Sequence, residues 1–296
     1  MILRTVLIAI ALALSAIPAH AKLKVVASFS ILADMAARVG ENEVEIHTLV
    51  GPNGDAHAFQ PTPANAKAIA EADVIVLNGL GFEPWVERLM KSSKPKGLVI
   101  IASEGVKPRR FGADSAGAID PHAWQDLANG KIYIRNITEG FATTDKANAD
   151  YYRENEKIYL GDIELSETKL RKAIAAVPAE RRKVITSHDA FGYFGAAYGI
   201  EFVAPLGVST EDQPSAKSVA KLIDQIRREH ISAVFVENIT DPRLIKQIAS
   251  ETGAKLGGEL FSDALSKPGG AAATYTDMFG HNREALVAAM MGKENK

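Results

Sequence analysis

The sequence feature that most constrains the fold is a regular alternation of short β-branched runs with longer helical patterns. Strands that alternate with helical segments are typical of βαβ units and parallel sheets. The runs that we predict to be strands are residues 23–29, 44–50, 74–78, 98–102, 184–187, 201–206, 233–238 and 255–260. Because a long gap divides them into two series of four, we predict two similar α/β lobes.

The gap between the two series has a helical pattern of its own. From Thr144 to Val177 it contains a single glycine, Gly161, and no proline. Apolar residues recur at spacings of 7, 4, 7 and 4, which places them on one helix face; they are Tyr152, Tyr159, Ile163, Leu170 and Ile174. A helix of about 30 residues would be about 45 Å long. We therefore predict one rigid helix between the lobes, and the alternative is two helices broken near Gly161.

The N-terminal residues have the pattern of a secretory signal peptide. Arg4 precedes an apolar stretch, and Ala19-His20-Ala21 is a small-x-small cleavage site. An uncleaved membrane anchor is the alternative, because about 20 residues could just span a bilayer. We predict cleavage, which makes residues 1–21 the signal peptide, 22–142 the first lobe, 143–178 the linker helix and 179–296 the second lobe.

Charge and cysteine content narrow the class of protein. Removing Arg4 from the 34 basic residues leaves 33 against 36 acidic residues, a net charge of −3. No basic stripe is present, so we expect no nucleic-acid partner. The sequence has no cysteine, so we expect no disulfides, no lipid anchor at the cleavage point, and metal ligands made of nitrogen and oxygen only. The expected location is the periplasm.

Only some of the seven histidines are candidates for chemistry. His20 belongs to the signal peptide, His47 lies inside a predicted strand and His230 inside a charged helix. We interpret His47 and His230 as structural or solvated residues, and we expect His281 at a helix start. The remaining three are His57, His122 and His188.

The three remaining histidines share a position in the predicted fold with one carboxylate, Asp263. Each of these residues follows a predicted strand directly or lies in the loop after it, and two belong to each lobe. In open α/β sheets, ligands bind in the crevice beyond the carboxyl ends of the strands. We therefore expect all four side chains to line the cleft between the lobes.

The composition of this set favours a particular metal chemistry. Three imidazoles and one carboxylate suit Zn²⁺ in tetrahedral geometry, whereas Mn²⁺ prefers harder oxygen ligands. Four protein ligands leave no open position for an activated water, which favours holding the ion over hydrolysis with it.

Residues next to the candidates have predicted supporting roles. Asp120 is placed to accept a hydrogen bond from the His122 ring, or to cap the turn before Pro121. Glu237 ends a strand on the same rim, where it could orient His188 or balance charge, and a role as a further ligand is the alternative.

Local packing and capping are also expected around the candidate residues. Thr62 is a good N-cap and Pro63 sits at the first helical position, which fixes how the loop with His57 enters the helix. We expect Trp85 and Trp124 to pack under the site.

The mature chain also resembles a known family over essentially its whole length. The matching stretches are "DAHAFQPTPANAKAIAEADVIVLNGLGFEPW", "DPHAWQD", "TSHDAFGYFGAAYGI", "ISAVFVENI" and "GELFSDAL". They are similar to the metal-binding solute-binding proteins of bacterial ABC transporters for zinc and manganese. The resemblance implies two (β/α)4 lobes joined by one long helix, a metal site in the cleft, and little closure on binding. It also implies His57, His122, His188 and Asp263 as ligands, and delivery of the ion to a permease in the inner membrane.

The sequence departs from the family pattern in three places. The stretch at 105–119, "GVKPRRFGADSAGAI", is short and has no histidine, so we expect no second, low-affinity zinc-collecting site. A disulfide that is frequent in the second lobe is impossible without cysteine. Asn65 stands where Asp or Ser is common, a change that we expect to affect helix capping only.

These observations lead to one functional hypothesis and two rivals. We predict a monomeric, periplasmic zinc-binding protein that is not an enzyme, with manganese as the alternative ion. A secreted zinc hydrolase would need a motif such as H-E-x-x-H, and this spacing does not occur. A surface adhesin is disfavoured by the missing cysteine for a lipid anchor.

Overall fold

The computed structural model describes residues 21–111, 117–207, 209–211, 214–231 and 233–292. All of the predicted signal peptide except Ala21 lies outside the described residues. Within the described part of the chain, we find no helix with the length and apolar character needed to cross a membrane.

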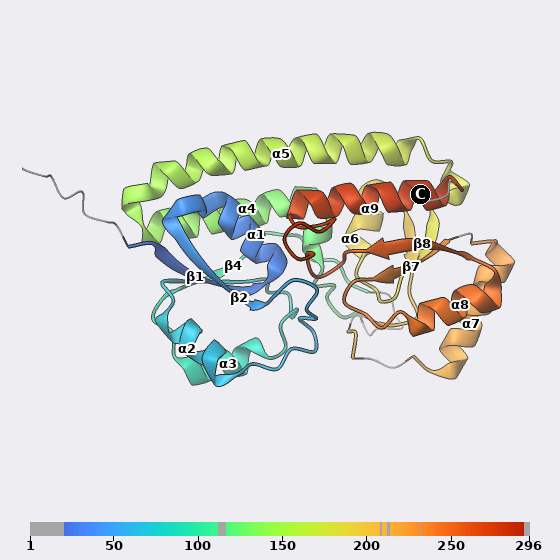
Figure 1. The fold of residues 1–296 in the computed structure, drawn as a ribbon, viewed down its shortest axis with the longest axis horizontal. Helices are drawn as coiled ribbons and strands as arrows, with labels where there is room; N and C mark the ends of the chain where they lie inside the picture. Colours follow the sequence, from blue (N-terminus) through green and yellow to red (C-terminus); the bar gives the residue numbers. More distant parts are fainter. Residues whose placement is uncertain (1–20, 112–116, 208, 212–213, 232, 293–296) are drawn as a thin grey trace, which may run out of the picture.

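The first lobe is built on a parallel sheet of four strands in the order β2-β1-β3-β4. The strands are β1 (Leu23–Phe29), β2 (Val44–Val50), β3 (Val74–Leu77) and β4 (Leu98–Ile101). Its helices are α1 (Ser30–Gly40), α2 (Pro63–Glu71), α3 (Val86–Ser93) and α4 (Leu127–Thr144). In Figure 1, α2 and α3 lie on one side of the sheet and α1 and α4 on the other. Helices on both faces explain why β1 and β3 are almost entirely buried.

The second lobe repeats this topology, with a parallel sheet in the order β6-β5-β7-β8. Its strands are β5 (Lys183–Ile185), β6 (Glu201–Val203), β7 (Ala233–Glu237) and β8 (Lys255–Leu260). Its helices are α6 (Gly192–Tyr198), α7 (Ala216–Glu229), α8 (Arg243–Thr252) and α9 (Tyr275–Met290). The two α/β lobes and all eight predicted strands are therefore confirmed, although β5 ends two residues and β6 three residues before the predicted ends at 187 and 206.

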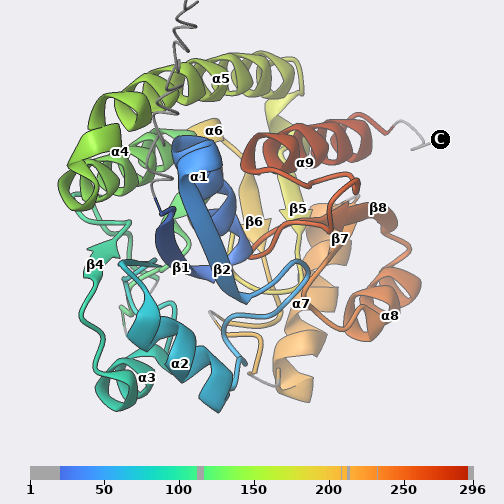
Figure 2. The same cartoon turned by 60° about the vertical axis from the view of Figure 1, so that its left-hand side comes forward.

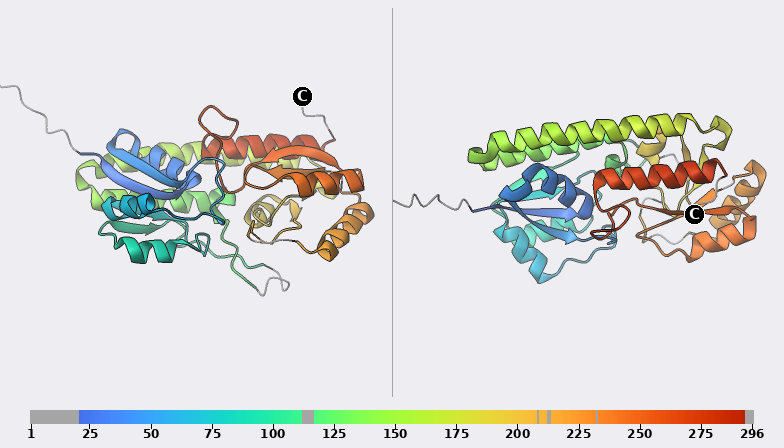
Figure 3. Two further views of the ribbon diagram at one scale, coloured as in Figure 1. Left: turned by 60° about the horizontal axis from the view of Figure 1, so that its bottom comes forward. Right: turned by 45° about the horizontal axis from the view of Figure 1, so that its top comes forward.

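A single long helix, α5 (Ala149–Ala175), spans both lobes, as Figures 1 and 3 show. Its 27 residues correspond to about 40 Å. The helix continues through Gly161 without a break, so the alternative of two helices is wrong. Its buried face includes all five apolar residues of the predicted stripe.

The helix starts later than the predicted linker, which began at residue 143. Helix α4 runs on to Thr144, and the chain then leaves the helical region at Asp145 (φ −120°, ψ 81°). A 3-10 turn, Lys146–Asn148, intervenes before α5 begins. The Tyr152 hydroxyl donates to Asp145 Oδ2 at 2.8 Å, which ties the turn to the first part of α5.

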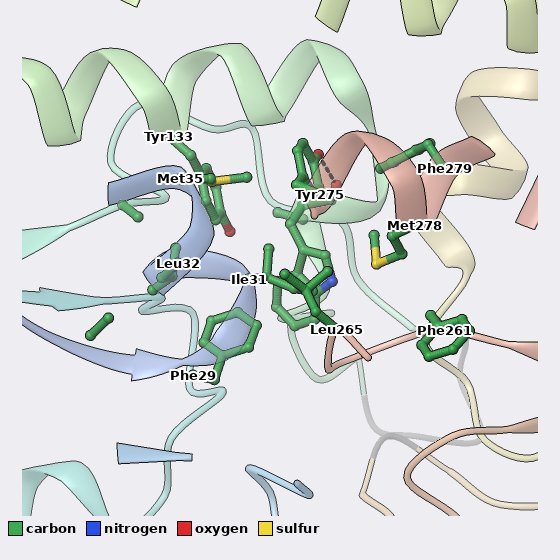
Figure 4. Close-up of a cluster of buried hydrophobic side chains, with 14 of the residues drawn as sticks. Phe29, Ile31, Leu32, Met35, Tyr133, Phe261, Leu265, Tyr275, Met278 and Phe279 are labelled. Carbon is green, nitrogen blue, oxygen red and sulfur yellow. Dashed lines mark hydrogen bonds between the residues drawn. The ribbon is translucent and has the colours of Figure 1, made fainter. Parts of the chain in front are cut away.

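The two lobes share one hydrophobic core. Helix α9 runs alongside α5, and Figures 1 and 2 show both helices reaching from the second lobe toward the first. Buried side chains from β1, α1, α4, α5, α9 and the second sheet form one continuous cluster. Figure 4 shows Ile31 of the first lobe beside Leu265 and Tyr275, which come from the second half of the chain. A smaller core lies under α7 and α8 and belongs to the second lobe alone.

Candidate metal centre

The structure brings the four candidate side chains together at one point between the lobes. One ligand atom from each of His57, His122, His188 and Asp263 lies within 4.8 Å of all the others. Asp263 Oδ2 is 3.2 Å from His57 Nε2, 3.1 Å from His188 Nε2 and 3.7 Å from His122 Nε2. The Nε2 atoms of His57 and His122 are 3.3 Å apart.

These positions follow from the topology. His57 lies in the loop after β2, His188 three residues after β5, and Asp263 three residues after β8. His122 directly precedes a 3-10 turn, Ala123–Gln125. The carboxyl ends of parallel strands meet at one edge of each sheet, and the two edges face each other across the lobe interface.

The spacing of the four atoms suits a small tetrahedral ion. Zn²⁺ bonds of about 2.0–2.1 Å to nitrogen and oxygen give a tetrahedron with edges of about 3.3 Å. The four separations given above, 3.1–3.7 Å, lie around this value, and every pair of the four ligand atoms lies within 4.8 Å. The site is also closed to bulk water, because His57 is 7% exposed and the other three residues are fully buried.

A carboxylate lies behind two of the three histidines. Asp120 Oδ1 accepts from the backbone N–H of His122 at 3.0 Å and is 2.9 Å from its ring Nδ1, so both predicted roles of Asp120 are present. Glu237 Oε2 lies 2.6 Å from His188 Nδ1, while Oε1 accepts from the backbone N–H groups of Ser187 and His188. Such partners fix the ring orientation and present Nε2 toward the centre.

In the absence of an ion, the charges of neighbouring side chains shift the pKa values of His188 and Asp263. Burial raises the pKa of Asp263, but the neighbouring His122 and His188 outweigh it and hold this pKa well below its usual range. Burial lowers the pKa of His188, yet the carboxylates of Glu237 and Asp263 hold it well above its ordinary value. A metal ion that binds here therefore competes with a proton for the His188 ring.

The loop that presents His57 is held by a residue that sequence reasoning missed. Asp55 Oδ1 accepts from the backbone N–H of His57 at 2.9 Å, and Asp55 Oδ2 accepts from the Thr210 hydroxyl of the second lobe. The signal was present in the sequence, because "DAH" at 55–57 repeats the Asp-x-His spacing of "DPH" at 120–122.

The capping and packing predictions near His57 are confirmed. The Thr62 side chain accepts from the backbone N–H of Asn65, and the Asn65 side chain accepts from that of Thr62, with Pro63 at the first helical position. Trp85 is buried and donates from its indole to the Ala56 carbonyl at 2.8 Å.

The other histidines among the described residues lie away from the centre. His47 is exposed on β2, and His230 is exposed at the C-terminal end of α7. The expectation for His281 was wrong in its position: α9 begins at Tyr275 after the Thr274 cap, so His281 lies inside the helix. There its Nε2 donates to the Glu259 carbonyl at 2.9 Å.

Comparison with known proteins also assigns this chain to a family of metal-binding proteins. Residues 25–289 match the family described as zinc-uptake complex component A, periplasmic. The metal ABC transporter substrate-binding lipoprotein SloC of Streptococcus mutans is 32% identical over 276 residues, which cover 91% of this chain and 90% of SloC.

Two solved structures share the fold. The manganese-bound periplasmic metal-binding protein of Candidatus Liberibacter asiaticus superposes with a TM-score of 0.80 at 33% identity, covering 91% of this chain and all of the other. The periplasmic zinc-binding protein TroA of Treponema pallidum superposes with a TM-score of 0.86 at 28% identity, covering 91% and 99%. The chain therefore belongs to the zinc-uptake complex component A family, whose members are metal-binding solute-binding proteins of ABC transporters and not enzymes.

Proposed function

We propose that this protein captures Zn²⁺ in the periplasm and delivers it to an ABC permease in the inner membrane. His57, His122, His188 and Asp263 are the proposed ligands, with the ion as transported cargo. The observation that carries the proposal is the preformed, buried set of three imidazole nitrogens and one carboxylate oxygen within 4.8 Å of one another, a set of ligands that suits Zn²⁺.

The second candidate cargo is Mn²⁺, and one feature of the site favours it. Asp263 Oδ1 is buried and has no hydrogen-bond partner among the described residues. If both oxygens of Asp263 contacted the ion, five ligand atoms would surround it, and the additional oxygen would suit Mn²⁺ better than Zn²⁺. The two solved relatives are described as zinc-binding and manganese-bound, so they support either ion.

The proposal extends to the organisation of the chain. Residues 1–21 would be removed on secretion, and the mature protein would act as a monomer. The lobes would comprise residues 22–142 and 179–296, with 143–178 as the linker region that contains α5.

Metal analysis of the isolated protein, followed by competitive titration of zinc against manganese, tests the function. We expect one divalent ion per chain and tighter binding of zinc. Tighter binding of manganese would select the alternative, and a metal-stripped protein that binds neither ion would reject the proposal.

A further inference from the structure

Asp263 differs from His122 and His188 in how its orientation is fixed. His122 and His188 each have a carboxylate behind the ring, at 2.9 and 2.6 Å from Nδ1. Asp263 lies in a loop after β8, and its Oδ1 has no hydrogen-bond partner in the described part of the chain. Its Oδ2 contacts two other proposed ligands, at 3.2 Å from His57 Nε2 and 3.1 Å from His188 Nε2, so the backbone on either side carries the connection from the carboxylate to the rest of the second lobe.

The backbone carbonyl directly before Asp263 is held by two donors from the other lobe. Trp124 Nε1 donates to the Ser262 carbonyl at 2.9 Å, and Gln125 Nε2 donates to the same oxygen at 2.6 Å. All three residues are fully buried, so no water competes for this oxygen. Trp124 and Gln125 belong to the 3-10 turn that directly follows His122.

The turn itself is rigidly placed. The Trp124 ring packs against Phe29 and Phe82, with centroids 5.0 and 4.6 Å apart, and lies 5.4 Å from the His122 ring. The Tyr275 hydroxyl at the start of α9 donates to the Trp124 carbonyl, the bond drawn as a dashed line in Figure 4. His122 therefore directly precedes the turn that contains both donors of this buried contact, and Asp263 directly follows its acceptor, Ser262.

We propose that Trp124 and Gln125 are positioning residues that fix the span between Asp263 and the first-lobe histidines and thereby favour zinc over manganese. This inference rests on the proposed function. With the carbonyl held, Asp263 Oδ2 stays 3.2 Å from His57 Nε2 and 3.7 Å from His122 Nε2. That span suits four short bonds. A released loop would let the carboxylate turn both oxygens or a bound water toward the ion, which suits Mn²⁺ better.

The test measures zinc and manganese affinities by competition in Trp124→Phe and Gln125→Met. Each variant removes one donor to the Ser262 carbonyl. Gln125→Met keeps the length of the side chain, and Trp124→Phe keeps an aromatic ring at the buried position. We expect the zinc-to-manganese affinity ratio to fall by at most about fivefold in each variant, a change that corresponds to about 1 kcal/mol, the strength of one hydrogen bond.

Tyr152→Phe is the matched control. It also removes one hydrogen bond of a buried aromatic residue, to Asp145 Oδ2 at 2.8 Å, but at the far end of α5. The control should lower the melting temperature without changing the affinity ratio.

The possible results separate this inference from the proposed function. Wild-type protein that binds no divalent ion would reject the function itself. Wild-type binding with an unchanged ratio in both variants, or equal losses for both metals, would overturn the positioning role. If one variant does not fold, the other still removes a donor from the same carbonyl and decides the question.

Discussion

At the scale of single residues, the four proposed ligands are interdependent, because each contributes one corner of a small shell. We expect His57→Ala, His122→Ala and His188→Ala each to abolish tight binding of zinc, since three ligands leave the shell open to water. Calorimetry of the metal-stripped variants checks this.

The control for these variants is His47→Ala, which removes an exposed imidazole on β2 and should bind one zinc ion per chain as the wild type does. Tight zinc binding by any of the three ligand variants would show that its histidine is not a ligand.

Protonation of His188 predicts how zinc affinity depends on pH. The pKa of this imidazole is raised by Glu237 and Asp263, so in the metal-free protein it keeps its proton to a higher pH than a free histidine, whose pKa is about 6.5. Zinc and the proton compete for the ring, and zinc affinity should therefore rise with pH until the proton is lost.

Glu237→Gln separates the two effects of this carboxylate. Removing the charge lowers the pKa of His188, so the rise in zinc affinity should shift to lower pH. The loss of the orienting partner should weaken binding at the high-pH plateau by about tenfold. Measured affinities between about pH 6 and 9, a range around the ordinary histidine pKa, give both quantities. A profile parallel to that of the wild type would contradict the role of Glu237.

The candidate site was predictable in part, because its residues follow strand ends. His188 and Asp263 each lie three residues after a strand, and parallel strands bring such residues to one edge of a sheet. The contact between Trp124 and Ser262 joins residues 138 positions apart. No local pattern encodes such a pairing, which depends on how the finished lobes pack, so Trp124 was recognised only as a packing residue.

At the scale of elements, the glycines of α4 and α5 show how context decides the effect of a substitution. Gly161 lies in the middle of α5, and a Cβ there would meet no atom within 4 Å. We expect Gly161→Ala to stabilise the protein by about 0.5–1 kcal/mol, because alanine loses less backbone entropy in a helix. A shift of the urea unfolding midpoint to higher concentration would report this gain.

Gly140→Ala in α4 is the matched comparison. A Cβ at this position would lie 2.1 Å from Ile100 Cδ1 of β4, so the side chains must move and the variant should unfold at lower urea than the wild type. Equal midpoints for the two variants would show that helix propensity, and not contact with the sheet, dominates at both positions.

Helix boundaries were less predictable than the elements themselves. The stripe from Tyr152 to Ile174 identified α5 because its period matches the buried face. The sequence around the break at Asp145 contains neither glycine nor proline, the residues that usually indicate the end of a helix. It forms because the chain must turn there from α4 into α5, a requirement of packing that local propensity does not contain.

At the scale of the whole molecule, the shared core limits how the lobes can move. Buried side chains of α1, α4, α5 and α9 form one cluster that includes residues of both lobes. Opening the cleft by a hinge would expose part of this cluster to water, at a free-energy cost of about 25 cal/mol per Å² of apolar surface. The ligand atoms already lie at metal-binding spacing, so binding requires no such movement.

A distance measurement between the lobes tests this rigidity. The chain has no cysteine, so Lys67→Cys on α2 and Lys246→Cys on α8, both exposed, give two unique positions for spin labels. We expect the mean distance between the labels to change by less than about 2 Å when zinc is added, as in other preorganised binding proteins. A rise in melting temperature with zinc would show that the labelled protein is loaded. A larger change in distance would mean that the common core does not lock the lobes, and that ligands placed on opposite lobes come together only when the ion arrives.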